Sequence, residues 1–362
     1  MMKKHSLLAI SLVAAIATAQ IAIAKPLASK VSNKLAPANN IAYPESELST
    51  RFTSWGISPK YTKSSINLKD SWKKFTKKKD IIVAVVDTGI QYNHPFLKNN
   101  VYHINGKGNK ANFGKDFSVK SAKNTPSDSH GHGTHVAGII KSIFPDVKLL
   151  TLKYYNPKAS GTANLNSTIK ALKYAVDNNV DIINYSGGGP EASEAEKRVL
   201  KEAEKKGILI IAAAGNEKSN IDIKKNHYFP ASYGLSNIIT VGAHDEFNKV
   251  IASSNYGSKS VDIAAPGYRI KSSIPGNGAG LMTGTSQATA FVTGVAALIK
   301  SNFPKLNYQQ VRNIILSSSK KISSLKGKVL GGGKLDAARA IEVANYVNQR
   351  LNPTPGRSVA RK

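Results

Sequence analysis

Short apolar runs alternate with longer stretches of helical periodicity through the middle of the chain. The runs are continuously apolar, as expected for strands buried on both faces of a sheet. Five strands are predicted in this way, at residues 81–86, 148–152, 180–184, 208–214 and 237–243. Helical spacing of apolar residues predicts a helix over 164–179, and early acids, late lysines and a following glycine predict another over 191–206. This alternation predicts an α/β fold with three α/β/α layers, a mainly parallel central sheet, and ligand chemistry at the carboxyl ends of its strands.

The N-terminal residues have the order of a secretory signal peptide, predicted to span residues 1–24. Lys3 and Lys4 precede an apolar stretch that is too short to cross a bilayer, and small residues follow it. We expect cleavage after Ala24, with Ala19 as the alternative. The protein is therefore expected to be secreted, either into a periplasm or out of the cell.

Composition divides the rest of the chain into three segments. Residues 25–49 are rich in Ala, Ser, Asn, Pro and Lys without periodicity and are predicted to be a short flexible leader. Residues 50–347 carry the strand and helix patterns and form the predicted globular domain. Residues 348–362 are basic, contain two prolines and are predicted to be a disordered tail.

Charge and cysteine content narrow the chemistry. The 362 residues include 51 Lys and Arg against 22 Asp and Glu, a formal net charge of +29. Only eight of the basic residues are Arg, and no nucleic-acid-binding motif is present, so we expect no specific nucleic-acid partner but electrostatic adsorption to anionic envelope surfaces. The absence of cysteine excludes disulfides, a thiol nucleophile and thiolate metal sites. Histidine, carboxylate and hydroxyl chemistry remain.

Three segments carry such groups. Asp87 ends the first predicted strand and is followed by Thr-Gly. His132 lies in the string Gly-His-Gly-Thr-His-Val-Ala-Gly, whose second histidine, His135, is expected to be buried and structural. Ser286 lies in the string Thr-Gly-Thr-Ser-Gln-Ala-Thr-Ala, directly before an apolar helix pattern. Singly, the aspartate and the serine are typical of helix caps, and only the three segments together indicate catalysis.

In this order the three segments resemble the subtilisin-like serine peptidases, over essentially the whole predicted domain. The resemblance implies a subtilisin-like fold and a triad of Asp87, His132 and Ser286 that hydrolyses peptide bonds through an acyl-enzyme intermediate. It also implies an oxyanion hole made by the Asn216 side chain and the Ser286 backbone N–H. The protein is thus expected to be a secreted serine endopeptidase that acts on protein or peptide substrates as a monomer.

The resemblance further implies which residues bind substrate. They are Ser186, Gly187, Gly188, Ser160, Gly161, Ala213 and Gly215. Gly187 stands where the family often has a larger residue, so we expect a wider pocket beyond the cleavage site. Glu217 either favours a basic side chain in the primary pocket or is a solvated surface acid, and the sequence leaves both interpretations open.

Two departures from the family pattern concern the serine segment and the leader. Gln287 and Ala290 stand where the family usually has methionine and proline. The missing proline leaves the geometry of the helix open, and the missing methionine predicts resistance to peroxide. The leader is shorter than the inhibitory prosegments common in the family, so we expect the domain to reach its active fold without one.

A third departure concerns calcium. The family commonly has a carboxylate after the His-Pro pair that follows the catalytic aspartate, and Phe96 stands there. The connection after the helix that begins at His132 is also short. We therefore expect no cofactor and no high-affinity calcium site. A weaker site that uses Asp116, Asp128 or Asp262 stays open.

Two other interpretations compete with the peptidase. His130, His132 and His135 superficially resemble the ligands of a metallo-hydrolase, although Thr134 stands where such sites place an aspartate. The second alternative is a catalytically dead binding protein on the same fold. It is disfavoured because the triad positions and Asn216 are all filled.

Overall fold

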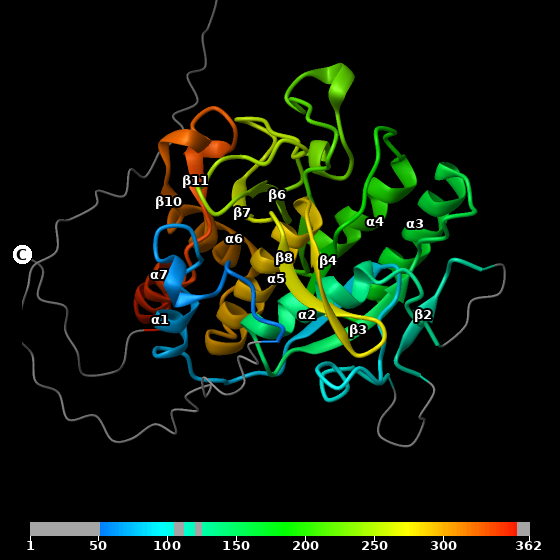
Figure 1. Cartoon of the computed structure of the whole chain (residues 1–362), viewed down its shortest axis with the longest axis horizontal. Helices are drawn as coiled ribbons and strands as arrows, with labels where there is room; N and C mark the ends of the chain where they lie inside the picture. The colour runs from blue at the N-terminus through cyan, green and yellow to red at the C-terminus, as the bar shows by residue number, and fades with distance from the viewer. Residues whose placement is uncertain (1–50, 105–111, 120–124, 353–362) are drawn as a thin grey trace, which may run out of the picture. The chain divides into compact units, whose positions relative to one another are not determined.

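The structure is a computed structural model that describes residues 51–104, 112–119 and 125–352 (Figure 1). The predicted signal peptide, the leader and residues 353–362 of the predicted tail lie outside the described residues.

Strands and helices alternate along the described chain. The strands are β1 (Ile82–Asp87), β2 (Gly114–Asp116), β3 (Lys148–Lys153), β4 (Ile182–Tyr185), β5 (Leu209–Ala213), β6 (Ile238–His244), β7 (Ile263–Pro266), β8 (Ile270–Ile274), β9 (Gly278–Met282), β10 (Lys320–Lys321) and β11 (Gly333–Lys334). The helices are α1 (Leu68–Trp72), α2 (His132–Ile143), α3 (Gly161–Asp177), α4 (Glu194–Lys205), α5 (Thr285–Asn302), α6 (Tyr308–Ser317) and α7 (Ala337–Leu351). All five predicted strands and both predicted helices are confirmed, with ends that differ by up to three residues.

Nine of the strands form one sheet in the order β10-β11-β7-β6-β5-β4-β1-β3-β2. Every neighbouring pair is parallel except β10 with β11, so the predicted mainly parallel sheet is confirmed. β8 and β9 form a separate antiparallel hairpin. Because β1, β4 and β5 are neighbours, their carboxyl ends meet at one edge of the sheet.

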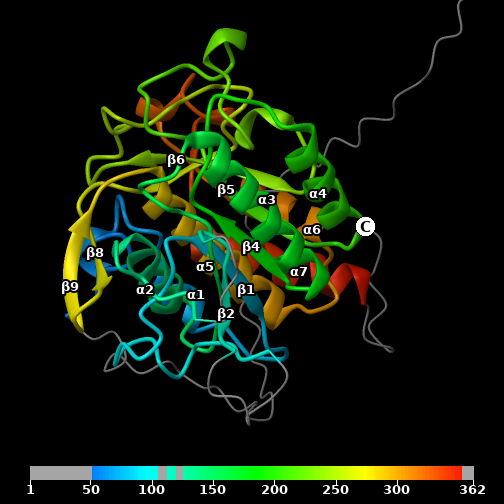
Figure 2. The ribbon, with the colours of Figure 1, turned by 90° about the vertical axis from the view of Figure 1, so that its right-hand side faces the viewer.

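Helices cover both faces of the sheet. Val83 and Val85 of β1 join a core with α2, α5, α6 and α7, whereas Ala84 and Val86 join a second core with α3 and α4. Helices α3 and α4 lie on one side of the sheet, at the right of Figure 1 and facing the viewer in Figure 2. Alternate residues of one strand therefore face different helical layers, which explains the continuously apolar strand pattern and confirms the three-layer fold.

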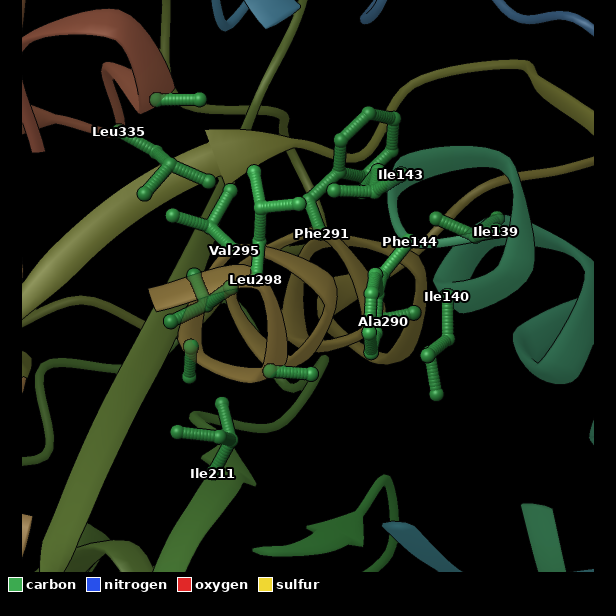
Figure 3. Close-up of a cluster of buried hydrophobic side chains, with 14 of the residues drawn as sticks. Ile139, Ile140, Ile143, Phe144, Ile211, Ala290, Phe291, Val295, Leu298 and Leu335 are labelled. Carbon is green, nitrogen blue, oxygen red and sulfur yellow. The ribbon is translucent and has the colours of Figure 1, made fainter. Parts of the chain in front are cut away.

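The first of these cores is centred on α5. Ile140 and Ile143 of α2 and Phe291, Val295 and Leu298 of α5 form one fully buried cluster (Figure 3). Although it lacks the proline of the family pattern, α5 is an unbroken helix of 18 residues, which settles its geometry. Its burial on all sides fixes the helix, and with it the position of its first turn.

The C-terminal helix α7 continues through Leu351. The boundary predicted at residue 347 is therefore four residues before the end of this helix, whose buried residues Ile341 and Ala344 anchor it to the core. Within the described residues, none of the helices combines the length and apolarity that a membrane span requires.

Candidate active site

Three polar side chains meet at the carboxyl edge of the sheet. Asp87 is the last residue of β1, His132 the first of α2 and Ser286 the second of α5. His132 Nδ1 lies 2.7 Å from Asp87 Oδ1. The Asp87 carboxylate is 3% exposed, and the same oxygen accepts the Thr88 N–H at 2.7 Å. The buried carboxylate therefore orients one specific nitrogen of the imidazole and leaves its Nε2 for other chemistry.

Gly133 allows this approach of α2 to β1. A Cβ atom at this position would lie 2.0 Å from the backbone oxygen of Gly89 and 3.2 Å from the Asp87 carboxylate. Any larger residue would push the start of α2 away from the strand end. Glycine is therefore required next to His132 because a side chain there would collide with the end of β1, which the sequence alone does not reveal.

A second buried carboxylate, Asp128, holds the start of α2. Its Oδ1 accepts the N–H groups of His130 and Gly131 and the Thr88 hydroxyl at 2.8–3.0 Å, and its Oδ2 accepts the N–H and hydroxyl of Thr134 at 2.9 and 2.7 Å. These groups flank His132 on both sides. The sequence offered Asp128 only as a weak calcium ligand, and its role as the acceptor for this turn was missed.

The two carboxylates also act on the His132 proton equilibrium. Burial alone would lower the pKa of His132, but the charge and hydrogen bond of Asp87, with a further contribution from the charge of Asp128, together raise this pKa above its ordinary value. A raised pKa makes the imidazole a better acceptor for a proton from a hydroxyl.

Ser286 is placed by the first turn of α5 and is 6% exposed. Its hydroxyl donates to the backbone oxygen of Ser186 at 3.0 Å, and the Ser186 hydroxyl donates back to the Ser286 carbonyl at 3.3 Å. Among the described residues, the Ser286 hydroxyl thus hydrogen-bonds to Ser186 and not to His132.

Hydrogen-bond donors surround the serine. The Asn216 side-chain oxygen accepts the Thr285 N–H at 3.0 Å, which leaves its exposed amide NH₂ free to donate. The N–H of Ser286 lies in the first helical turn, where no intrahelical acceptor exists. The Asn216 side chain and the Ser286 N–H are thus both at the first turn of α5, where the sequence analysis predicted an oxyanion hole.

Asn255, which the sequence analysis did not single out, fixes the loop that carries Asn216. It is 1% exposed, accepts the N–H groups of Glu217 and Ser219 at 3.0 and 2.9 Å, and donates to the Ala214 oxygen at 2.9 Å and to Glu217 Oε2 at 2.6 Å. The Glu217 carboxylate is thus part of the loop's internal bracing. No local signal could have revealed Asn255, because its partners are 36 to 41 residues away in the chain.

The remaining predicted residues form the walls beside the serine. Ser186, Gly187 and Gly188 follow β4, whereas Ala213 ends β5 and Gly215 follows it. Gly161 begins α3, and the Ser160 hydroxyl caps this helix by accepting the Ala163 N–H at 3.2 Å. Gly161 and Gly188 line the same cavity of about 510 Å³.

The space that a side chain at Gly187 would occupy is already filled, so the glycine does not by itself widen the pocket. A Cβ atom there would lie 2.2 Å from the Tyr154 hydroxyl oxygen and 3.0 Å from Tyr185 Cε2. The volume that a larger residue would fill is taken up by aromatic side chains from β4 and from the segment after β3.

The histidine cluster does not converge on one point. His135 is fully buried, and its Nε2 lies 2.9 Å from the Ile270 oxygen and 3.2 Å from the Gly280 oxygen, which confirms its structural role. Across the described ranges, no group of three or more His, Cys, Asp or Glu side chains is arranged to hold a metal ion. The geometry does not support the metallo-hydrolase interpretation.

A buried Asp–His pair beside a serine at a helix start, on the carboxyl edge of a parallel sheet, defines a serine hydrolase. Residues 78–339 match the model of the Subtilase family, and the chain belongs to this family. The match covers more than half of the chain. The protein is accordingly a serine endopeptidase of the subtilisin-like class, as predicted.

Similar proteins agree with this assignment. The chain is 38% identical over 245 residues to the "Major intracellular serine protease" of Bacillus subtilis (strain 168), covering 65% of this chain and 73% of that protein. It is 37% identical over 254 residues to "Subtilisin" of Bacillus pumilus, covering 68% of this chain and 86% of that protein. A solved structure titled as a cold adapted subtilisin-like serine proteinase superposes with a TM-score of 0.61 at 28% identity, covering 71% of this chain and 88% of that one.

Proposed function

We propose that Asp87, His132 and Ser286 are the catalytic triad of a secreted endopeptidase. The observation that carries the triad is the 2.7 Å contact of His132 Nδ1 with the buried Asp87 carboxylate. A serine hydroxyl is a weak nucleophile at neutral pH and needs a base. His132 Nε2 supplies it once the Ser286 hydroxyl rotates away from the Ser186 oxygen.

The reaction then follows from the positions of these groups. Ser286 Oγ attacks the substrate carbonyl as His132 takes its proton, and Asp87 stabilises the imidazolium. The developing oxyanion accepts hydrogen bonds from the Asn216 side chain and the Ser286 N–H. His132 returns the proton to the leaving amine, and water attacks the acyl-enzyme by the reverse sequence.

Kinetics of single variants test the triad. In a member of this family, removing the serine or the histidine lowers kcat by roughly a million-fold, and removing the aspartate costs about two orders of magnitude less. We expect the same order for Ser286→Ala, His132→Ala and Asp87→Ala. Appreciable hydrolysis by Ser286→Ala, after removal of contaminating peptidases, would contradict the assignment.

Secretion is supported by the N-terminal sequence alone. One similar protein is named as intracellular, so family membership does not decide the compartment. Expression of the full chain in a bacterium, followed by mass determination of the N-terminus in each cell fraction, tests this proposal. We expect a new N-terminus at Lys25 outside the cytoplasm, and its loss in the variant Leu8→Arg, which interrupts the apolar stretch. Retention of Met1 on cytoplasmic protein would contradict secretion.

The remaining partners follow from charge. The excess of lysine supports adsorption to anionic envelope polymers, and a Debye length of about 10 Å at 0.1 M salt predicts its release at high salt. Binding that persists in 1 M salt would contradict this electrostatic origin.

We also propose that the protein acts as a monomer. Its molecular mass in solution, measured by light scattering, tests this proposal.

A further inference from the structure

A single tyrosine ring spans the gap between the two segments that flank the serine. A Cβ atom at Gly188 would lie 2.4 Å from Tyr228 Cε1, and a Cβ atom at Gly215 would lie 3.0 Å from Tyr228 Cδ2. These two ring carbons are on opposite edges of the same phenol. Tyr228 therefore contacts the segment after β4 with one edge and the segment after β5 with the other.

The backbone around Tyr228 is tied to the same walls. Phe229 exchanges two backbone hydrogen bonds with Gly189, at 3.0 and 2.7 Å. Ser232 closes the turn on the other side, because its N–H donates to the Tyr228 oxygen at 2.8 Å and its hydroxyl accepts the Tyr228 N–H at 3.1 Å. The ring is thus held between the walls by a fixed turn and does not belong to a free loop.

The proposed reaction indicates which part of the substrate would enter this gap if the Tyr228 ring did not occupy it. The attacked carbonyl lies at Ser286 Oγ, and its oxygen points toward the Asn216 side chain. The acyl side of the substrate runs along residues 186–188, where glycines permit close backbone pairing. The side chain on the attacked residue is then directed between the ends of β4 and β5, which is the space that Tyr228 spans.

We propose that Tyr228 fills the primary specificity pocket and restricts cleavage to substrates with a small side chain, such as glycine, alanine or serine, on the residue whose carbonyl is attacked. This inference rests on the proposed triad and deepens it. A large aromatic or basic side chain would have to displace a ring that contacts both walls. The Glu217 carboxylate accepts a hydrogen bond from the Asn255 amide at 2.6 Å and lies beside Gly215, on the wall that Tyr228 contacts.

Peptides that differ only at the attacked residue test the inference. With glycine, alanine, leucine, phenylalanine and lysine at that position, we expect the wild type to prefer alanine over phenylalanine in kcat/KM on the order of 100-fold. Tyr228→Gly and Tyr228→Ala open the gap and should reverse this ranking. Tyr228→Phe keeps the ring, is the matched control and should keep the wild-type ranking.

Active-site titration with a fluorophosphonate separates two kinds of failure. A preparation with no titratable serine that cleaves none of the peptides contradicts the proposed function. A fully titrated wild type that cleaves the phenylalanine and alanine peptides equally well contradicts the role of Tyr228 alone. Because the wild-type ranking itself decides, the test holds even where Tyr228→Gly does not fold.

Discussion

The carboxylate of Asp128 allows a prediction in which stability and pH dependence change together. In Asp128→Asn the side chain keeps its shape but accepts through only one atom. The less costly orientation places the remaining oxygen toward Thr88, His130 and Gly131, so that the new NH₂ group faces the N–H of Thr134. One buried backbone N–H then lacks an acceptor, which costs about 1–3 kcal/mol of unfolding free energy.

The same substitution removes a negative charge that, together with the larger effect of Asp87, raises the pKa of His132 against the lowering effect of burial. The pKa of His132 should therefore fall in Asp128→Asn. Because the neutral imidazole is the active base, activity appears as pH rises through this pKa. The acid limb of kcat/KM should accordingly move to lower pH in the variant.

Two measurements check these effects. Urea unfolding is measured in the Ser286→Ala background, which prevents self-digestion, and the pH profile is measured in the active enzyme. Asp222→Asn is a matched control, because Asp222 also accepts two backbone N–H groups, from Lys259 and Ser260, in a different loop. The control should lose stability without moving the acid limb. An Asp128→Asn enzyme with wild-type stability and an unmoved acid limb would refute the reasoning.

Further predictions concern the oxyanion, oxidation and calcium. Asn216→Ala should lower kcat on the order of 100- to 1,000-fold with little change in KM, because its hydrogen bond forms mainly in the transition state; an effect on KM alone would count against it. The wild type should outlast Gln287→Met in peroxide, although Met282, 4.0 Å from Gln287, can still oxidise, and equal inactivation would contradict this. The melting temperature should not differ between millimolar calcium and excess chelator. The reason is that the Lys141 ammonium already donates to the Phe96 oxygen and lies 4.6 Å from the Phe96 ring centroid. A calcium site whose Kd is a thousandfold below the added calcium would instead stabilise the folded protein by about 4 kcal/mol and raise the melting temperature, which would contradict this prediction.

The sequence predicted the parts of this protein that are encoded locally. The buried strands gave continuous apolar runs, and the residues of the proposed triad lie in short strings whose glycines allow close packing, as Gly133 does. The two-residue strands β10 and β11 were not predicted, because a run that short carries no periodicity. The hairpin of β8 and β9 was missed because serine and glycine interrupt the apolar residues of its two short strands.

The parts that depend on distant contacts could not be predicted. Asp128 and Asn255 are polar residues in loops, and only the folded chain brings them to the backbone groups that they hold. The sequence analysis expected open space beside Gly187. In the folded chain the Tyr154 hydroxyl, from a residue more than 30 positions earlier, fills that space. The contacts of Tyr228 with the segments of Gly188 and Gly215 likewise form only in the folded chain.

Labelling of the nucleophile tests the central claim most directly. A fluorophosphonate incubated with the full chain should modify one serine per molecule, and peptide mapping should find the label on Ser286. The label should be absent in Ser286→Ala and form far more slowly in His132→Ala, in proportion to the lost hydrolysis. Stoichiometric labelling of Ser286→Ala at another residue, or peptide hydrolysis that survives complete labelling of Ser286, would contradict the account.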